Sequence, residues 1–161
     1  MQSSFKEIVE EIVGSHHSLL RKELPRITKL VDELTESSPS EPVAEARQIF
    51  EKVRNKIEKH LKDEETVLFP TGITIESGGP GPHCDVDLIE RLEEMEKEHD
   101  GCGKALTTIH QMIASSTPQS ELRDELLRTL QVVQDDLTIH VEKENQNVHP
   151  RFLELLANRT K

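Results

Sequence analysis

The stretch His60-Leu-Lys-Asp-Glu64-Glu-Thr-Val-Leu-Phe-Pro70 recurs, without a gap, as His140-Val-Glu-Lys-Glu144-Asn-Gln-Asn-Val-His-Pro150. Both copies read His-x3-Glu-x5-Pro, and in a helix the His and the Glu of such a pair lie one turn apart on the same face. The residues upstream repeat as well, because His17 precedes His60 by 43 positions and His99 precedes His140 by 41. This pattern predicts two helical hairpins of one plan, packed about a pseudo-twofold axis.

Three clusters of helix-breaking residues divide the chain into four long segments. The clusters are Ser37–Pro42, Thr71–His83 and Ser115–Pro118, and the segments cover about residues 3–36, 42–69, 85–115 and 119–157. Each segment is rich in Glu, Lys, Arg and Leu with little β-type alternation, which favours helix. We therefore predict one all-α domain over residues 1–161, an antiparallel up-down-up-down four-helix bundle. Pro25 is expected to kink or split the first helix.

In every segment, apolar residues recur at alternating steps of three and four, which is the core stripe of a bundle helix. The first stripe is Val13, His17, Leu20, Leu24, Ile27, Val31 and Leu34. The second is Val43, Ala46, Phe50, Val53, Ile57, His60, Glu64 and Val67. The third is Leu88, Leu92, Met95, His99, Cys102, Leu106, Ile109 and Ile113. The fourth is Leu126, Leu130, Val133, Leu137, His140, Glu144 and, more weakly, Asn147.

One histidine interrupts each stripe, and two stripes also carry a glutamate, so that six donors converge in mid-bundle: His17, His60, Glu64, His99, His140 and Glu144. A buried ionised glutamate is costly unless it is paired or bound to metal. Six such donors suit two metal ions, with carboxylates between them and about two imidazoles for each ion. Iron, manganese or zinc would fit, and availability in cells favours iron. The alternative is a metal-free helical interaction domain with satisfied core histidines.

The composition argues against several other classes of protein. Lys and Arg total 20 against 31 Asp and Glu, a net charge of −11, which argues against nucleic acid or an anionic membrane as partner. The chain has no Trp and no Tyr, no run near the ~18 apolar residues of a membrane span, and no GxGxxG fingerprint. Its first residues lack the features of a signal peptide. We expect a soluble cytoplasmic protein without a flavin or nicotinamide.

The residues resemble a known family along nearly the whole chain. The resemblance rests on Ile12-Val13-x2-His16-His17-x3-Arg21-x-Glu23-Leu24-Pro25, on His60-x3-Glu64-Glu65-x2-Leu68-Phe69-Pro70, on Met95-Glu96-x-Glu98-His99-Asp100, and on His140-x3-Glu144-Asn145-x2-Val148-x-Pro150. These motifs are similar to those of the hemerythrin-like (HHE) domains, and most closely to those of the repair-of-iron-centres (RIC) proteins. In oxygen-carrying hemerythrins a second histidine follows four residues after the third-helix ligand, where this chain has Gly103.

The resemblance implies an oxo- or hydroxo-bridged di-iron centre with two Fe ions per chain. His17, His60, His99 and His140 would be terminal ligands, and Glu64 and Glu144 the bridging carboxylates. It further implies a role in nitrosative or oxidative stress through iron–sulfur cluster repair, iron donation or NO reduction. The partners would be O2 or NO, iron–sulfur client proteins and an external electron donor. The alternative is a sensor or carrier of O2, NO or iron without turnover, so enzymatic activity of an NO-reductase or peroxidase type stays open.

Several histidines, the glutamate before His99 and the two cysteines lie outside the six predicted donors. His16 competes with His17 for the first ligand position, and the match of Glu98-His99 with His16-His17 favours His17. Glu98 is either a second-sphere acceptor or an exposed carboxylate. Cys102 is expected to be a buried inert thiol. We assign no role to His83 and Cys84 in the Gly/Pro-rich loop, and we expect His110 and His149 on the surface.

Overall fold

The computed structural model describes residues 3–80 and 85–159, and every regular element in these ranges is helical. The elements are α1 (Phe5–Ile12), η1 (Val13–His17), α2 (Ser18–Ser37), α3 (Glu41–Asp63), η2 (Glu64–Leu68), α4 (Phe69–Glu76), α5 (Asp85–Ser116), α6 (Glu121–Lys143), η3 (Glu144–Val148) and α7 (His149–Arg159). The three η segments are π-helical and follow their α-helices without interruption. Four long helices result, as the sequence predicts.

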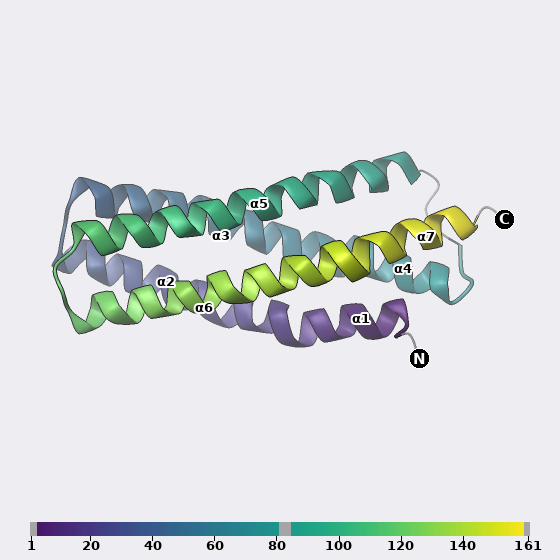
Figure 1. The fold of residues 1–161 in the computed structure, drawn as a ribbon, viewed down its shortest axis with the longest axis horizontal. Coiled ribbons are helices and arrows are strands. Elements are labelled where there is room, and N and C mark those ends of the chain that lie inside the picture. The colour runs from purple at the N-terminus through teal and green to yellow at the C-terminus, as the bar shows by residue number, and fades with distance from the viewer. Residues whose placement is uncertain (1–2, 81–84, 160–161) are drawn as a thin grey trace.

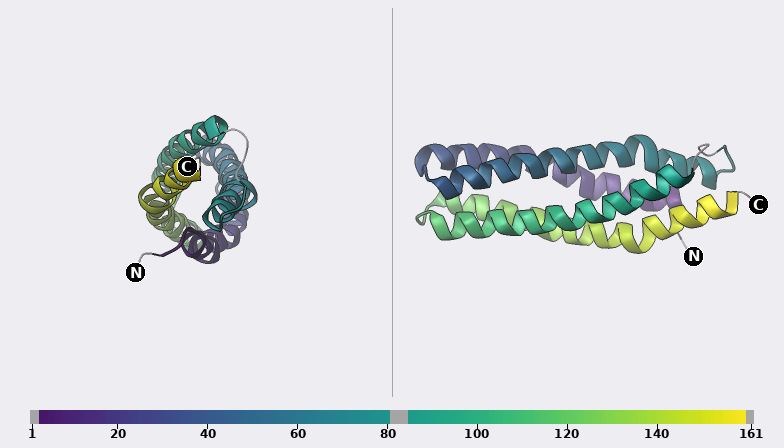
Figure 2. Two further views of the ribbon diagram at one scale, coloured as in Figure 1. Left: turned by 90° about the vertical axis from the view of Figure 1, so that its right-hand side faces the viewer. Right: turned by 90° about the horizontal axis from the view of Figure 1, so that it is seen from above.

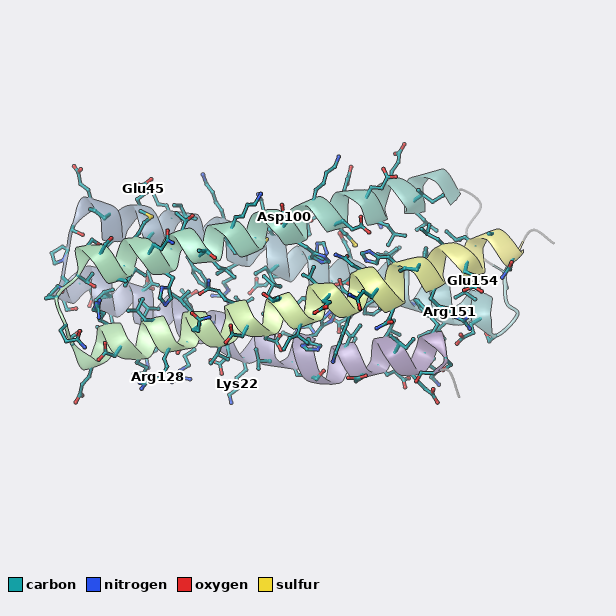
Figure 3. The ribbon with its side chains drawn as sticks, viewed as in Figure 1. Lys22, Glu45, Asp100, Arg128, Arg151 and Glu154 are labelled. Carbon is teal, nitrogen blue, oxygen red and sulfur yellow. The ribbon has the colours of Figure 1, made fainter. Side chains whose placement is uncertain are left out.

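The four long helices lie side by side in an elongated bundle (Figure 1). α3 packs against α5 and α2, and α6 packs against the same two helices, so the four form a ring in cross-section (Figure 2). Charged side chains such as Glu45, Asp100 and Arg128 point outward from this ring (Figure 3). No helix in the described ranges is both long and apolar enough to cross a membrane.

Serine caps explain where three of the helices begin. The Oγ atoms of Ser4, Ser40 and Ser120 accept hydrogen bonds from the backbone N–H groups of the third residue onward, at 3.1, 3.2 and 3.1 Å. Each cap satisfies one of the backbone donors that the first turn of a helix leaves free. The helix starts are therefore fixed locally, within one or two residues of the positions expected from the breaker clusters.

The buried apolar residues form two clusters, separated by a polar layer. The larger cluster contains Leu20, Leu61, Cys102 and Leu137, and the smaller contains Ile12, Leu68, Met95 and Val148. Along each long helix a predicted ligand lies at the boundary between the clusters: His17, His99 and His140 in three helices, and Glu64 in the helix formed by α3, η2 and α4. The bundle therefore holds its histidines and glutamates between two apolar ends that keep them from solvent.

The second long helix extends further than expected, because Pro70 and Gly72 do not end it. Pro70 is the second residue after the π turn η2, and the helix continues through it into α4. A Cβ at Gly72 would lie 2.1 Å from Cε1 of the buried Phe5 ring, so this glycine permits close packing between α4 and α1. The prediction that the helix ends near residue 69 is therefore wrong, and it continues to Glu76.

Pro25 lies inside α2, which runs through it without a break, so the helix does not split there. Pro25 cannot donate a hydrogen bond to the carbonyl of Arg21. Both residues are exposed, so water can hydrate that carbonyl. The departure from regular α-helical geometry in this long helix lies before Pro25, in the π turn η1.

The π segments shift the core stripes by one residue. In each, a backbone N–H reaches the carbonyl five residues back: Ser18 to Val13, Phe69 to Glu64 and His149 to Glu144. One extra residue is thereby inserted into the turn. The structure buries Ile12, Leu68 and Val148 in place of the predicted Val13, Val67 and Asn147.

Candidate metal centre

The polar layer contains all six side chains that the sequence analysis singled out. His17, Glu64 and Glu144 are fully buried, and His60, His99 and His140 are between 2 and 6% exposed. Their donor atoms form two groups, within each of which the atoms lie no more than 4.8 Å apart. The first group is His17, Glu64, His140 and Glu144, and the second is His60, His99 and Glu144.

Glu144 connects the two groups. Its Oε1 lies 2.5 Å from Nε2 of His140, and its Oε2 lies 3.2 Å from Nε2 of His99. In the first group, Oε1 of Glu64 lies 3.5 Å from Nε2 of His17. The geometry thus places a carboxylate oxygen beside an imidazole in both groups.

Acidic residues outside the layer hold the far nitrogens of two of these imidazoles. Nδ1 of His60 lies 3.0 Å from Glu98, and Nδ1 of His17 lies 3.3 Å from Glu65, which is itself bound by Arg21. Metal-binding histidines in proteins are held in this way, and the contact fixes which nitrogen faces the metal. Glu98 is therefore a partner of His60, whereas Glu65 is a functional contact that sequence reasoning missed.

Many polar atoms of the layer have no hydrogen-bond partner within the described part of the chain. These atoms are Nε2 of His17 and of His60, both ring nitrogens of His99, Nδ1 of His140, both carboxylate oxygens of Glu64, and Oε2 of Glu144. A buried polar atom without a partner is costly, and so many in one layer are unusual in a native protein. Nitrogen and oxygen donors gathered in this way fit metal ions of the iron, manganese or zinc type.

Burial sets the protonation of the layer. Mainly through desolvation, the pKa of His17 falls from 6.5 to about 4 and that of His99 to about 3, and the pKa of His60 is lowered as well. Burial and the charge of Glu144 raise the pKa of Glu64. Although burial disfavours its charge, the neighbouring Glu64 and His140 hold the pKa of Glu144 below its usual range. At neutral pH these three imidazoles are therefore uncharged, and of the two carboxyl groups Glu64 holds a proton more strongly than Glu144 does.

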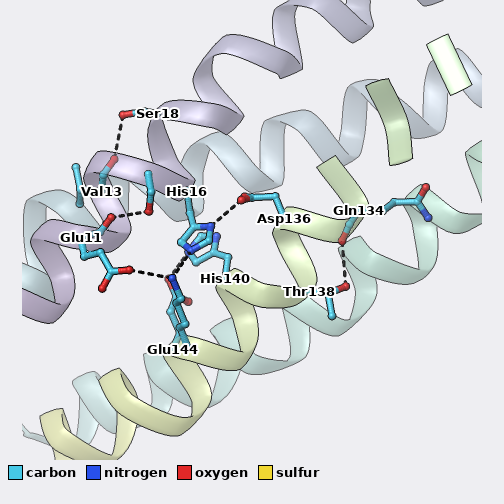
Figure 4. Close-up of polar contacts among 11 residues, drawn as sticks. Glu11, Val13, His16, Ser18, Gln134, Asp136, Thr138, His140 and Glu144 are labelled. Atoms are coloured by element: carbon cyan, nitrogen blue, oxygen red, sulfur yellow. Dashed lines mark hydrogen bonds and ion pairs between the residues drawn. The ribbon is translucent and has the colours of Figure 1, made fainter. Parts of the chain in front are cut away.

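His16 is buried next to His17 but faces other partners. Its Nδ1 lies 2.7 Å from Oδ1 of Asp136, and its Nε2 lies 3.0 Å from Nζ of Lys143 (Figure 4). Its ring stacks on His140, with centroids 5.3 Å apart. Because both nitrogens are engaged, His16 belongs to neither donor group, whereas His17 does.

Three other sequence-based expectations can be compared with the structure. Cys102 is buried as expected, and burial raises the pKa of its thiol. His149 is not a surface residue: it is 3% exposed, and its ring stacks on that of His99. The ungapped repeat contained the signal, because it aligns His149 with the buried Phe69. His110 is half-buried, while His83 and Cys84 lie outside the described residues.

A small cavity adjoins the layer on one side. It has a volume of about 20 Å³ and is lined by His60, His99 and His140 together with apolar residues such as Ile57 and Leu137. Roughly 10–15 Å³ of such volume is enough for one water molecule. The cavity therefore has room for a very small ligand beside three of the imidazoles.

Comparison with known proteins gives the same picture. The family described as hemerythrin HHE cation binding domain matches residues 9–152. The iron-sulfur cluster repair protein YtfE of Dickeya chrysanthemi is 26% identical, over 94% of this chain and 67% of its own length. A probable iron-sulfur cluster repair protein of Haemophilus influenzae is 26% identical, over 94% of this chain and 66% of its own. The chain thus spans about two thirds of the length of these relatives. From the match over residues 9–152, the chain belongs to the hemerythrin HHE cation-binding domain family.

Proposed function

We propose that this chain is a non-haem di-iron protein of the repair-of-iron-centres type, which acts on damaged iron–sulfur proteins in nitrosative or oxidative stress. The observation that carries the proposal is the buried layer of six His and Glu side chains, whose unpartnered atoms form two donor groups with Glu144 in common. The names of the relatives, which are iron-sulfur cluster repair proteins, support the same role.

In this proposal His17, His140 and Glu64 hold one ion, His60 and His99 hold the other, and Glu144 contacts both. The family resemblance would make Glu64 a second bridging carboxylate, whereas in this geometry its oxygens belong to the first donor group only. Bound iron would supply open positions for a diatomic ligand and one-electron chemistry at each ion.

The residues of the chain prepare the site for a metal in two ways. The lowered pKa values of His17, His60 and His99 keep these imidazoles neutral, with a lone pair free to bind, because a proton and a metal ion compete for the same nitrogen. Glu65 and Glu98 fix the orientation of two of the rings from outside the layer. Because the pKa of Glu64 is raised, a metal ion would compete with a proton for this carboxyl group.

The cavity beside His60, His99 and His140 supports a very small ligand for the site. O2 or NO would fit a space of about 20 Å³, whereas an organic substrate would not. Its walls are largely apolar and include Leu20 and Leu137, and the charged residues Lys56 and Glu98 also line it.

We also propose that the chain is one antiparallel domain built from two repeated hairpins. Two features support this architecture: η2 and η3 begin at equivalent glutamates, Glu64 and Glu144, and Phe69 stacks on His17 as His149 stacks on His99.

We further propose that the protein works in the cytoplasm, where the reducing conditions suit the free Cys102.

The test begins with the metal content and optical spectrum of the protein purified from iron-supplied cells. Two irons per chain are expected, and a His110→Ala variant should match the wild type because His110 belongs to neither donor group. Absence of iron in a folded chain would overturn the di-iron proposal.

The second step separates the possible roles. The iron-loaded protein is mixed with an apo iron–sulfur protein and a thiol reductant, and cluster formation on the client is followed by its absorbance. In parallel, the protein receives NO and a chemical reductant, and N2O is measured. We expect iron to reach the client. N2O without iron transfer would replace repair by NO reduction, and neither activity would favour a sensor.

A further inference from the structure

His149 is a buried histidine that the proposed centre does not use. It is 3% exposed and stands at the start of α7, directly after η3. Its Nδ1 lies 3.2 Å from Oε1 of Glu96, while its Nε2 is buried and has no hydrogen-bond partner among the described residues. Its ring is nearly parallel to that of His99, with an interplanar angle of 12° and centroids 6.3 Å apart.

The two ring nitrogens of His149 have the same kinds of neighbours as those of His60. In both, Nδ1 contacts an exposed glutamate of α5, Glu98 for His60 and Glu96 for His149, and Nε2 is buried without a partner. A carboxylate on one nitrogen is the usual way in which a protein directs the other nitrogen of an imidazole to a metal. His149 therefore has the contacts of a ligand rather than those of a satisfied core histidine.

The other half of the repeat shows that packing alone does not require a histidine here. Phe69 occupies the equivalent position and stacks on His17 at 5.9 Å and 13°, almost the geometry of the His149–His99 pair. A phenyl ring would fill the same space without burying an unpaired nitrogen, which is costly. The histidine is explained if its Nε2 has a partner that the protein chain does not supply.

The two donor groups are also unequal. The first contains four side chains and the second only three, His60, His99 and Glu144. His149 lies beside the second group through its stacking on His99, although its nitrogens are not within 4.8 Å of all three donor atoms of that group, so binding would require its ring to move towards the ion. Resting on the proposed function, we propose that Nε2 of His149 is an additional donor to the metal ion held by His60, His99 and Glu144.

The direct test uses wild-type protein loaded with ¹¹³Cd²⁺ and labelled at its histidines. Scalar coupling between cadmium and ring protons passes only through a bond, so it separates a ligand from a ring that merely stacks. We expect coupling at His149 as well as at His60 and His99. Two bound cadmium ions without coupling at His149 would overturn this inference and leave the proposed centre intact, whereas a chain that binds no metal would overturn both.

A variant gives an independent measure. His149→Phe restores the residue of the other repeat, which keeps the stacked ring and removes the nitrogen. We expect the second equivalent of Fe²⁺ or Co²⁺ to bind at least about tenfold more weakly, with the first equivalent unchanged. His110→Phe is the matched control and should bind both ions as the wild type does. Equal affinities for the second ion in His149→Phe and the wild type would contradict the inference.

Discussion

Glu144 is the residue on which both metal positions depend, because its two oxygens face different histidines. Glu64 contributes to the first donor group only. We expect Glu144→Ala to lose both tightly bound irons, since each ion loses a carboxylate oxygen. Glu64→Ala should lose mainly the ion near His17 and retain close to one iron per chain. Metal analysis after gel filtration measures both, with circular dichroism to verify folding. Two tightly bound irons in Glu144→Ala would contradict the shared position of this residue.

Removing His16 or its neighbour His17 should affect iron binding differently. Nε2 of His17 faces Glu64 inside the donor layer, whereas both nitrogens of His16 contact Asp136 and Lys143. We expect His17→Ala to lose iron and His16→Ala to retain it. Removing the His16 ring leaves the partly buried Asp136 without its hydrogen-bond partner, while Lys143 keeps its ion pair with Glu11, so that variant should instead lose about 1–3 kcal/mol of unfolding free energy. Iron content and urea denaturation of both variants measure the two effects, and loss of iron in His16→Ala alone would reverse the assignment.

The sequence was sufficient to find the six layer residues because each interrupts an apolar stripe, where an idle polar side chain is costly. His149 and Glu65 were missed for different reasons. His149 lies one position after the predicted stripe, so its burial could be inferred only from its alignment with Phe69. Glu65 reaches His17 from another helix, and stripe periodicity carries no information about which helices face each other.

At the level of elements, the π segments explain where stripe prediction succeeded and where it failed. All eight predicted stripe residues of α5 are buried, and α5 contains no π segment. The other three stripes are displaced at η1, η2 and η3, at Val13, Val67 and Asn147. A regular three-four alternation assumes 3.6 residues per turn and cannot anticipate an inserted residue. π turns concentrate at functional sites, and here each contains or adjoins a predicted ligand.

Deleting the exposed Asn147 should convert η3 into a regular α-turn and leave the orientation of α7 unchanged, because the π turn absorbs one extra residue. Val148, Phe152 and Leu156 would then stand 3, 7 and 11 positions after Glu144, which is the regular spacing of a core stripe, and would stay in the smaller apolar cluster. We therefore expect the deletion to change the unfolding free energy little, as should Asn147→Ala, which keeps the chain length. Urea denaturation of both variants measures this. A loss of about 3–6 kcal/mol in the deletion variant, as expected if two such side chains became exposed, would show that the π turn does not absorb the extra residue.

For the whole molecule, the layer of titratable side chains lies between two apolar clusters. The stability of the folded chain therefore depends both on metal binding and on protonation of this layer. A metal ion that binds only the folded chain stabilises it by mass action. In its absence the buried imidazoles resist protonation while those of the unfolded chain do not. The same burial that prepares the histidines for metal therefore makes the metal-free protein sensitive to acid.

The metal-free protein should lose stability as the pH falls from about 6.5 towards 4. In this range the unfolded chain takes up protons at its histidines, while folded-state pKa values of about 4 for His17 and about 3 for His99 keep these two rings largely unprotonated in the folded chain. The lowered pKa of His60 acts in the same direction. Glu64, whose pKa is raised, acts in the opposite direction, but three histidines outweigh one carboxyl. The shift of His17 from 6.5 to about 4 alone corresponds to roughly 3 kcal/mol. Urea denaturation of metal-free protein at pH 7 and pH 4.5 measures the loss, and His99→Leu should reduce it. Stability that is unchanged or higher at pH 4.5 would contradict the neutral, metal-ready state of these rings.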